Sequence, residues 1–133
     1  MKYLLDKNIL SNDLTENISN RDDLCVTQDV LDEAFFTESE IKRIAAAGIK
    51  ILKVSKKHLE KLKEVLADHG DNFKLINLYS GKGTADIVMI AYILCEINNP
   101  ETLFPEDYTI VTKDKELISV AGLYGISCIP DLS

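Results

Sequence analysis

Residues 2–10 read KYLLDKNIL, an apolar run that stops abruptly at the carboxylate of Asp6. Such a run predicts a short buried strand whose C-terminal end presents this aspartate. In an open parallel α/β sheet, ligands bind in the crevice outside the carboxyl ends of the strands. A charge that ends a buried strand has little local use in the fold, so Asp6 is the first candidate for a functional residue.

Length and composition are those of an ordinary globular protein. The 133 residues are enough for one compact domain with a substantial core, and 46% of them are hydrophobic and 28% charged. The formal net charge of -7 has the wrong sign for a protein that coats nucleic acid non-specifically. A cluster of carboxylates that holds divalent cations would add negative charge while creating a site for phosphates.

The cysteines and the apolar segments bear on the compartment. Cys25, Cys95 and Cys128 form no CxxC pair and have no histidine at ligand spacing, so we expect small buried apolar residues in a reducing compartment rather than zinc ligands. The longest apolar run, residues 87–95, is too short to span a bilayer, and Asp6 interrupts any secretory signal. We therefore expect a cytoplasmic protein without a membrane association.

Apolar segments alternate along the chain with segments of helical periodicity. Strands are predicted over residues 2–5, 24–26, 49–54, 108–111 and 126–129. Helices are predicted over residues 30–36, 41–47, 56–68, 85–97 and 116–123. Residues 11–23 are predicted to form a loop or a poorly packed helix, and residues 73–79 one or two irregular helical turns. A hinge is predicted over residues 81–83 and a loop over residues 98–107. The alternation predicts a single α/β domain with a central parallel sheet of about five strands flanked by helices.

Two of the predicted helices have contrasting surfaces. The helix over residues 85–97 is apolar nearly all round and should be the buried central one. The helix over residues 56–68 is predicted to be an outer element capped by Ser55, and its apolar face comprises Leu59, Leu62, Val65 and Leu66.

Several acids fall at comparable places in this arrangement. Asp6 follows the first strand, Asp114 follows the fourth, and Asp86 lies in the first turn of the buried helix. Glu33 lies on the helix after the second strand. If the strands run parallel, these carboxylates can meet at one end of the sheet, where they must share protons or bind a cation. Oxygen ligands without histidine or cysteine suit Mg²⁺ or Mn²⁺ rather than zinc.

Structural interpretations of the same acids stay open. Asp86 can serve as a dipole partner in a first helical turn, Asp114 can be a helix N-cap, and Glu33 can face water.

The same segments carry a resemblance to a known family. Residues 4–10 (LLDKNIL), 30–33 (VLDE), 85–86 (AD) and 111–114 (VTKD) resemble the PIN domain, in the family's order and over nearly the whole chain. The resemblance implies a metal-dependent ribonuclease similar to the VapC-type toxins of toxin–antitoxin systems. It also implies an antitoxin partner, whose amphipathic helix would bind a groove beside the acids, and a homodimer.

Residue roles follow from the resemblance position by position. The acidic quartet that binds Mg²⁺ or Mn²⁺ corresponds to Asp6, Glu33, Asp86 and Asp114, and the small polar residues that support it correspond to Asn8 and Thr112. Bound ions would activate a water for attack on an RNA phosphodiester, and Glu33 would complete the shell or orient that water. Lys7 departs from the small residue that is frequent at this position, and it could place a cation beside the scissile phosphate.

Substrate binding is expected from lysines close to the acids in sequence, namely Lys7, Lys82, Lys113 and Lys115. Each of them can equally be a solvated surface residue. The Gly81-Lys82-Gly83 segment lacks the spacing of a phosphate-binding P-loop. The alternative function is a PIN-like protein-binding module with little or no catalytic activity, which the acidic charge favours. A phosphorylatable receiver-like domain is not supported, because Asp6 has no adjacent acid and Asp86 begins a helix.

Overall fold

A computed structural model describes residues 2–12, 23–33, 36–69, 84–97 and 107–130. One sheet of five strands runs through this part of the chain in the order β3-β2-β1-β4-β5. The strands are β1 (Lys2–Leu5), β2 (Leu24–Thr27), β3 (Lys50–Leu52), β4 (Tyr108–Val111) and β5 (Ser127–Ile129). Every pairing is parallel. The predicted α/β fold with a five-stranded parallel sheet is therefore confirmed.

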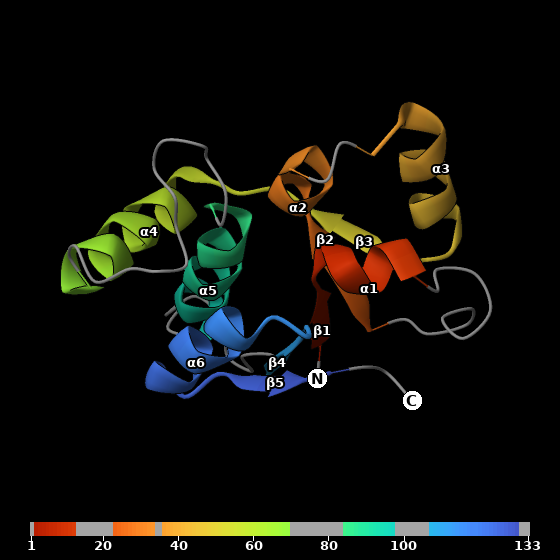
Figure 1. Cartoon of the computed structure of the whole chain (residues 1–133). Coiled ribbons are helices and arrows are strands. Elements are labelled where there is room, and N and C mark those ends of the chain that lie inside the picture. The colour runs from red at the N-terminus through yellow and green to blue at the C-terminus, as the bar shows by residue number, and fades with distance from the viewer. Residues whose placement is uncertain (1, 13–22, 34–35, 70–83, 98–106, 131–133) are drawn as a thin grey trace.

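Helices cover the sheet on both sides. They are α1 (Lys7–Asn12), α2 (Gln28–Glu33), α3 (Glu38–Ala46), α4 (Lys56–His69), α5 (Thr84–Ile97) and α6 (Lys115–Leu123). Helices α4, α5 and α6 lie on one side of the strands, and α1 and α3 lie on the other (Figure 1). None of the helices in the described ranges is long and apolar enough to cross a membrane.

The core is built around the apolar helix α5, as predicted. Its residues 87–93 are all buried, because apolar side chains occupy every side of these two turns. The helix becomes exposed only toward its end, where Ile97 is 42% accessible. The buried side chains of β1, β2 and β4 belong to the same core cluster as those of α5.

The predicted apolar face of helix α4 is only partly confirmed: Val65 is buried, but Leu59 is exposed and the unpredicted His58 is buried. Leu59 is 49% exposed, so its placement on the inner face was wrong. The neighbouring His58 is 4% exposed and stacks on the ring of Tyr92 with 4.3 Å between centroids. An aromatic partner on α5 therefore turns the histidine inward and leaves the leucine at the edge of the contact.

Local hydrogen bonds and backbone conformations explain where several other elements begin and end. Helix α3 begins with a complete capping box between Thr37 and Glu40, and Gly48 follows its last turn with a φ of 88°. Helix α1 was not predicted: the Asp6 carbonyl accepts hydrogen bonds from the N–H groups of Ile9 and Leu10, which turns the chain into a helix directly after β1. Strand β3 is shorter than the predicted 49–54.

Some predictions concern residues outside the described ranges, and the prediction of buried cysteines agrees only partly with the structure. Residues 13–22, 73–79, 81–83 and 98–106 lie outside the described ranges. All three cysteines are free thiols, but only Cys25 is fully buried, while Cys95 and Cys128 are half-buried.

Candidate functional site

Asp6 lies at the carboxyl end of the central strand β1. Its side chain is only 2% exposed, and its backbone N–H donates to the carbonyl of Val111 across the sheet at 3.0 Å. Strand β1 therefore places the buried carboxylate of Asp6 beside the end of β4. A carboxylate at such a position is costly unless hydrogen bonds or a cation compensate for the lost water.

Thr112 connects this carboxylate to a second one. Its hydroxyl donates to Asp6 Oδ2 at 2.7 Å and accepts the backbone N–H of Asp114 at 3.0 Å. Its own N–H donates to the carbonyl of Ile129 on β5 at 2.9 Å. Thr112 is thus fixed between three strand ends and holds the two acids in a defined relation. We call Asp6, Thr112 and Asp114 the acid edge.

Asp114 has a structural role in addition to its place in the acid edge. It is the N-cap of α6, and its Oδ1 accepts the N–H groups of Glu116 at 2.9 Å and Leu117 at 3.3 Å. The N-cap interpretation is therefore confirmed. Oδ2 takes no part in these two bonds, and the side chain is half-buried rather than enclosed.

The electrostatics of the acid edge oppose its ionisation. Burial raises the pKa of the Asp6 carboxyl above its ordinary value, and the nearby charge of Asp114 acts in the same direction. Hydrogen bonds from the Thr112 hydroxyl and the Lys7 N–H, the latter at 2.8 Å, lower that pKa but do not offset the burial. A divalent cation between the carboxylates would relieve both unfavourable effects.

The topology places these acids where parallel sheets bind ligands. From β1 the chain moves through β2 and β3 toward one edge, and then returns to add β4 and β5 on the other side of β1. The direction of winding therefore reverses between β1 and β4. Crevices at such switch points, outside the carboxyl ends of the strands, are the usual ligand sites of open α/β sheets. Asp6 and Asp114 follow these two strands.

The structure describes the other predicted site residues only in part. Asp86 is half-buried in the first turn of α5, as predicted, whereas Glu33 ends α2 and Asn8 lies in α1 with side chains outside the described set. Among the described side chains, no three His, Cys, Asp or Glu residues lie together closely enough to hold a metal ion. Asp86 therefore does not join Asp6 and Asp114 in a group of three.

The lysines near the acids differ in exposure. Lys7 is half-buried beside Asp6, and Lys113 and Lys115 are exposed on either side of Asp114. Lys82 lies outside the described ranges. Two exposed cationic side chains therefore flank Asp114 in the sequence, and a third, half-buried one follows Asp6.

The donor set of the acid edge fits Mg²⁺ or Mn²⁺. Magnesium is usually held by one or two carboxylates, with water and phosphate oxygens completing its octahedral shell. Asp6 and Asp114 supply such a pair. Within the described part of the chain, one Asp6 oxygen accepts the Lys7 N–H and the other accepts the Thr112 hydroxyl, and a carboxylate oxygen has lone-pair capacity for a second partner.

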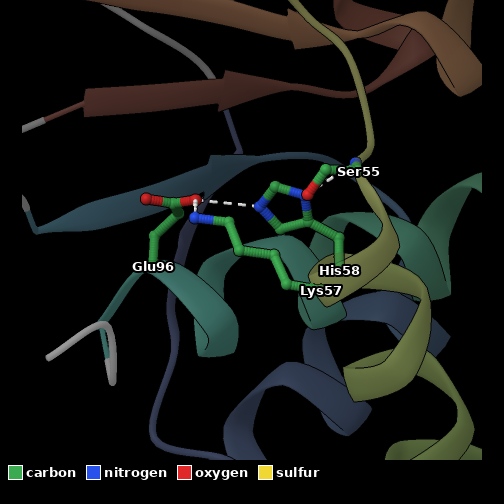
Figure 2. Close-up of polar contacts among 4 residues, drawn as sticks. All are labelled: Ser55, Lys57, His58 and Glu96. Carbon is green, nitrogen blue, oxygen red and sulfur yellow. Dashed lines mark hydrogen bonds and ion pairs between the residues drawn. The ribbon is translucent and has the colours of Figure 1, made fainter. Parts of the chain in front are cut away.

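A second polar cluster, on α4 and α5, was missed by the sequence analysis (Figure 2). The Ser55 N–H donates to His58 Nδ1 at 2.9 Å, and His58 Nε2 lies 2.8 Å from Glu96 Oε1. The Lys57 ammonium lies 3.4 Å from the same carboxylate oxygen. Because Nδ1 is an acceptor, the ring proton sits on Nε2 and is donated to Glu96. Only the Ser-x-x-His spacing at a helix start signalled this cluster, which we call the histidine cluster.

Comparison with known proteins provides no family assignment for this chain. No protein-family model matches it, and no curated protein matches it.

Proposed function

We propose that this protein is a metal-dependent endoribonuclease that hydrolyses RNA phosphodiester bonds at the acid edge, with Mg²⁺ or Mn²⁺ as cofactor. The observation that carries the proposal is the carboxylate of Asp6, which is 2% exposed, lies at the switch point of the sheet and is coupled to a second acid. Groups whose pKa is displaced by burial and a like charge occur preferentially at functional sites. The PIN-like segments of the sequence support the same reaction.

The chain's own residues have separable roles in this proposal. Asp6 and Asp114 would hold the ion, with Asp86 and Glu33 contributing through a bridging water. Thr112 fixes the Asp6 carboxylate through its hydroxyl. The bound ion would supply a water of lowered pKa and would neutralise charge on the phosphate. No side-chain nucleophile is required.

RNA would be held by the lysines at the acid edge. Lys113 and Lys115 are exposed beside Asp114, where their ammonium groups can reach phosphates on either side of the scissile bond. Lys7 would contact the phosphate nearest Asp6. A net charge of -7 is compatible with this mode of binding, because only the few lysines at the acid edge would contact the RNA. The PIN-like sequence further favours a cytoplasmic toxin with an antitoxin partner and a homodimeric state.

Cleavage of RNA by matched variants tests the proposal. The wild type should cut single-stranded RNA with Mg²⁺ or Mn²⁺ and lose activity in EDTA, and Asp6→Asn and Asp114→Asn should each reduce the rate at least about 100-fold, as expected when a charged group of the reaction centre is removed. Asp107→Asn is the matched control, because Asp107 is exposed and precedes β4 at its opposite end from Asp114. Equal activity in all three variants would refute the assignment.

A substrate-independent measurement separates metal binding from RNA choice. At about one hundred times its dissociation constant, a ligand of the folded state stabilises it by about 2.7 kcal/mol. Mn²⁺ should therefore raise the unfolding midpoint of the wild type and of Asp107→Asn, but not that of Asp6→Asn or Asp114→Asn. No response of the wild type would leave the acids without a cofactor.

Two observations favour a second candidate, a PIN-like protein-binding module. Asp114 already serves as the N-cap of α6, and the described side chains include no group of three metal-binding residues. A module of this kind would neither bind Mn²⁺ nor cut RNA. Loss of the metal response in the thermal experiment, with the fold intact, would select this candidate.

A further inference from the structure

The caps of α3 and α4 use the same arrangement with different acceptors. In α3 the N–H of the N-cap residue Thr37 donates to Glu40 Oε1 at 3.0 Å. In α4 the chain places Ser55 at the N-cap position, because its carbonyl accepts the first helical N–H groups, and its own N–H donates to His58 Nδ1 at 2.9 Å. In both helices a side chain three residues later accepts the cap N–H. Helix α4 uses an imidazole where α3 uses a carboxylate.

The two acceptors respond differently to acid. Hydrogen bonds from the Thr37 backbone and hydroxyl hold the pKa of Glu40 below its ordinary value, so this carboxylate remains an acceptor in mildly acidic solution. An imidazole has one lone pair, and protonation converts both ring nitrogens into donors. Ser55 Oγ also lies 2.9 Å from Nδ1, and a hydroxyl can accept as well as donate.

We propose that His58 is a proton-operated switch of the α4 N-terminus, independent of the acid edge. In the neutral state Nδ1 accepts the Ser55 N–H. In the protonated state Nδ1–H donates to Ser55 Oγ, and the Ser55 N–H loses its acceptor. Nε2–H donates to Glu96 in both states, so acid opens the cap while α4 stays attached to α5.

The ionisable groups around the His58 ring keep their charge states in mildly acidic solution. Glu96 lies 2.8 Å away; burial acts to raise its pKa, but hydrogen bonds from His58 and Lys57 outweigh burial and hold the pKa below its ordinary value. Burial raises the pKa of the Tyr92 hydroxyl and of the Cys95 thiol, so both remain neutral. The ring of Tyr108 on β4 lies edge-on to the ring of Tyr92, with 6.1 Å between their centroids.

A nucleophilic role for Ser55 is not supported by the same contacts. Ser55, His58 and Glu96 have the connectivity of nucleophile, base and orienting acid. The Nδ1 lone pair, however, already accepts the Ser55 N–H at 2.9 Å, and the ring is only 4% exposed. The geometry points to a helix cap that senses protons rather than to covalent catalysis.

Nuclear magnetic resonance of the ¹⁵N-labelled full chain tests the switch between about pH 8 and pH 5. The ring nitrogens report the tautomer and protonation of His58, and the amides of Ser55 and Thr37 report the two caps. As the ring takes up its proton, the Ser55 amide should shift and exchange about two- to ten-fold faster than its intrinsic pH dependence allows, the range for one lost hydrogen bond. The Thr37 amide should show neither change.

Two variants make the test specific. His58→Gln keeps an N3 acceptor that does not titrate, so the exchange of the Ser55 amide should follow only its intrinsic pH dependence and its chemical shift should stay constant. His69→Gln removes the other histidine and should leave the Ser55 response unchanged. The proposal is wrong if the His58 ring protonates without a change at the Ser55 amide, if the ring stays neutral throughout the range, or if His58→Gln retains the response.

Discussion

The two ends of strand β4 hold polar clusters of opposite character. At its start, Tyr108 packs against Tyr92, which stacks on His58 of the histidine cluster. At its finish, Thr112 joins Asp6 to Asp114. The first cluster pairs a carboxylate with an imidazole N–H and a lysine ammonium. The second brings two carboxylates together, one of them almost fully buried.

This difference distinguishes a structural cluster from a candidate site. In the histidine cluster, hydrogen bonds and the charge of Lys57 compensate for the burial of Glu96 and lower its pKa. In the acid edge, the hydrogen bonds to Asp6 fail to compensate, and its pKa is raised. Natural proteins tolerate such local conflict chiefly at functional sites. A cation is the simplest ligand that would remove it.

The largest effect on stability is expected at the structural end of β4. His58→Ala should lower the free energy of unfolding by about 3 kcal/mol, because it leaves a cavity beside Tyr92 and removes the ring partners of Ser55 and Glu96. Urea denaturation followed by circular dichroism measures the change. Leu59→Ala, on the neighbouring exposed position, should cost less than about 1 kcal/mol. Equal losses in the two variants would mean that the ring is not part of the core.

Sequence reasoning found the acid edge because its signals are local. Asp6 and Asp114 each follow a short apolar run, and in a parallel sheet the ends of such runs lie at the same edge. The sequence pattern could not show that β4 lies beside β1, since strand pairing is decided by contacts between segments a hundred residues apart. It also could not show that Asp86 fails to join a group of three, which depends on how α5 is positioned over the sheet.

The histidine cluster was missed for a physical reason. A helical stripe is read from apolar residues, and this criterion selected Leu59 and passed over His58. An imidazole becomes a core residue only when partners on another helix satisfy both nitrogens and its face, as Glu96 and Tyr92 do here. Those partners lie more than thirty residues away in sequence. Helix α1 was missed because its first hydrogen bonds use the carbonyl of Asp6, which was assigned only to the strand end.

An intermediate effect is expected from the residue that links the two acids. Thr112→Val keeps the shape of the side chain but removes the donor to Asp6 and the acceptor of the Asp114 N–H. The loss should be about 1–2 kcal/mol of unfolding free energy, together with weaker stabilisation by Mn²⁺. Thr112→Ser retains the hydroxyl and should behave nearly as the wild type in the Mn²⁺ titration. A normal Mn²⁺ response in Thr112→Val would show that the hydroxyl does not orient the carboxylate.

The smallest change in stability, and the one with the most informative sign, is expected for Asp6→Asn. The folded-state pKa of Asp6 is raised, so the folded protein binds more protons than the unfolded chain and, free of divalent ions, gains stability from this group as pH falls. Glu96 acts oppositely, because its pKa is lowered and its contribution to stability is lost on acidification.

Asp6→Asn should therefore be slightly more stable than the wild type at neutral pH, by less than the loss in Thr112→Val. It should also lose more stability than the wild type between about pH 7 and pH 4. Glu96→Gln should lose less over the same interval. Thermal unfolding in EDTA measures both slopes. Mn²⁺ should reverse the order of Asp6→Asn and wild type, because the proposed metal site is intact only in the wild type. If Asp6→Asn were the less stable protein in EDTA, the carboxylate would be part of a satisfied structural network, and the contrast between the two ends of β4 would disappear.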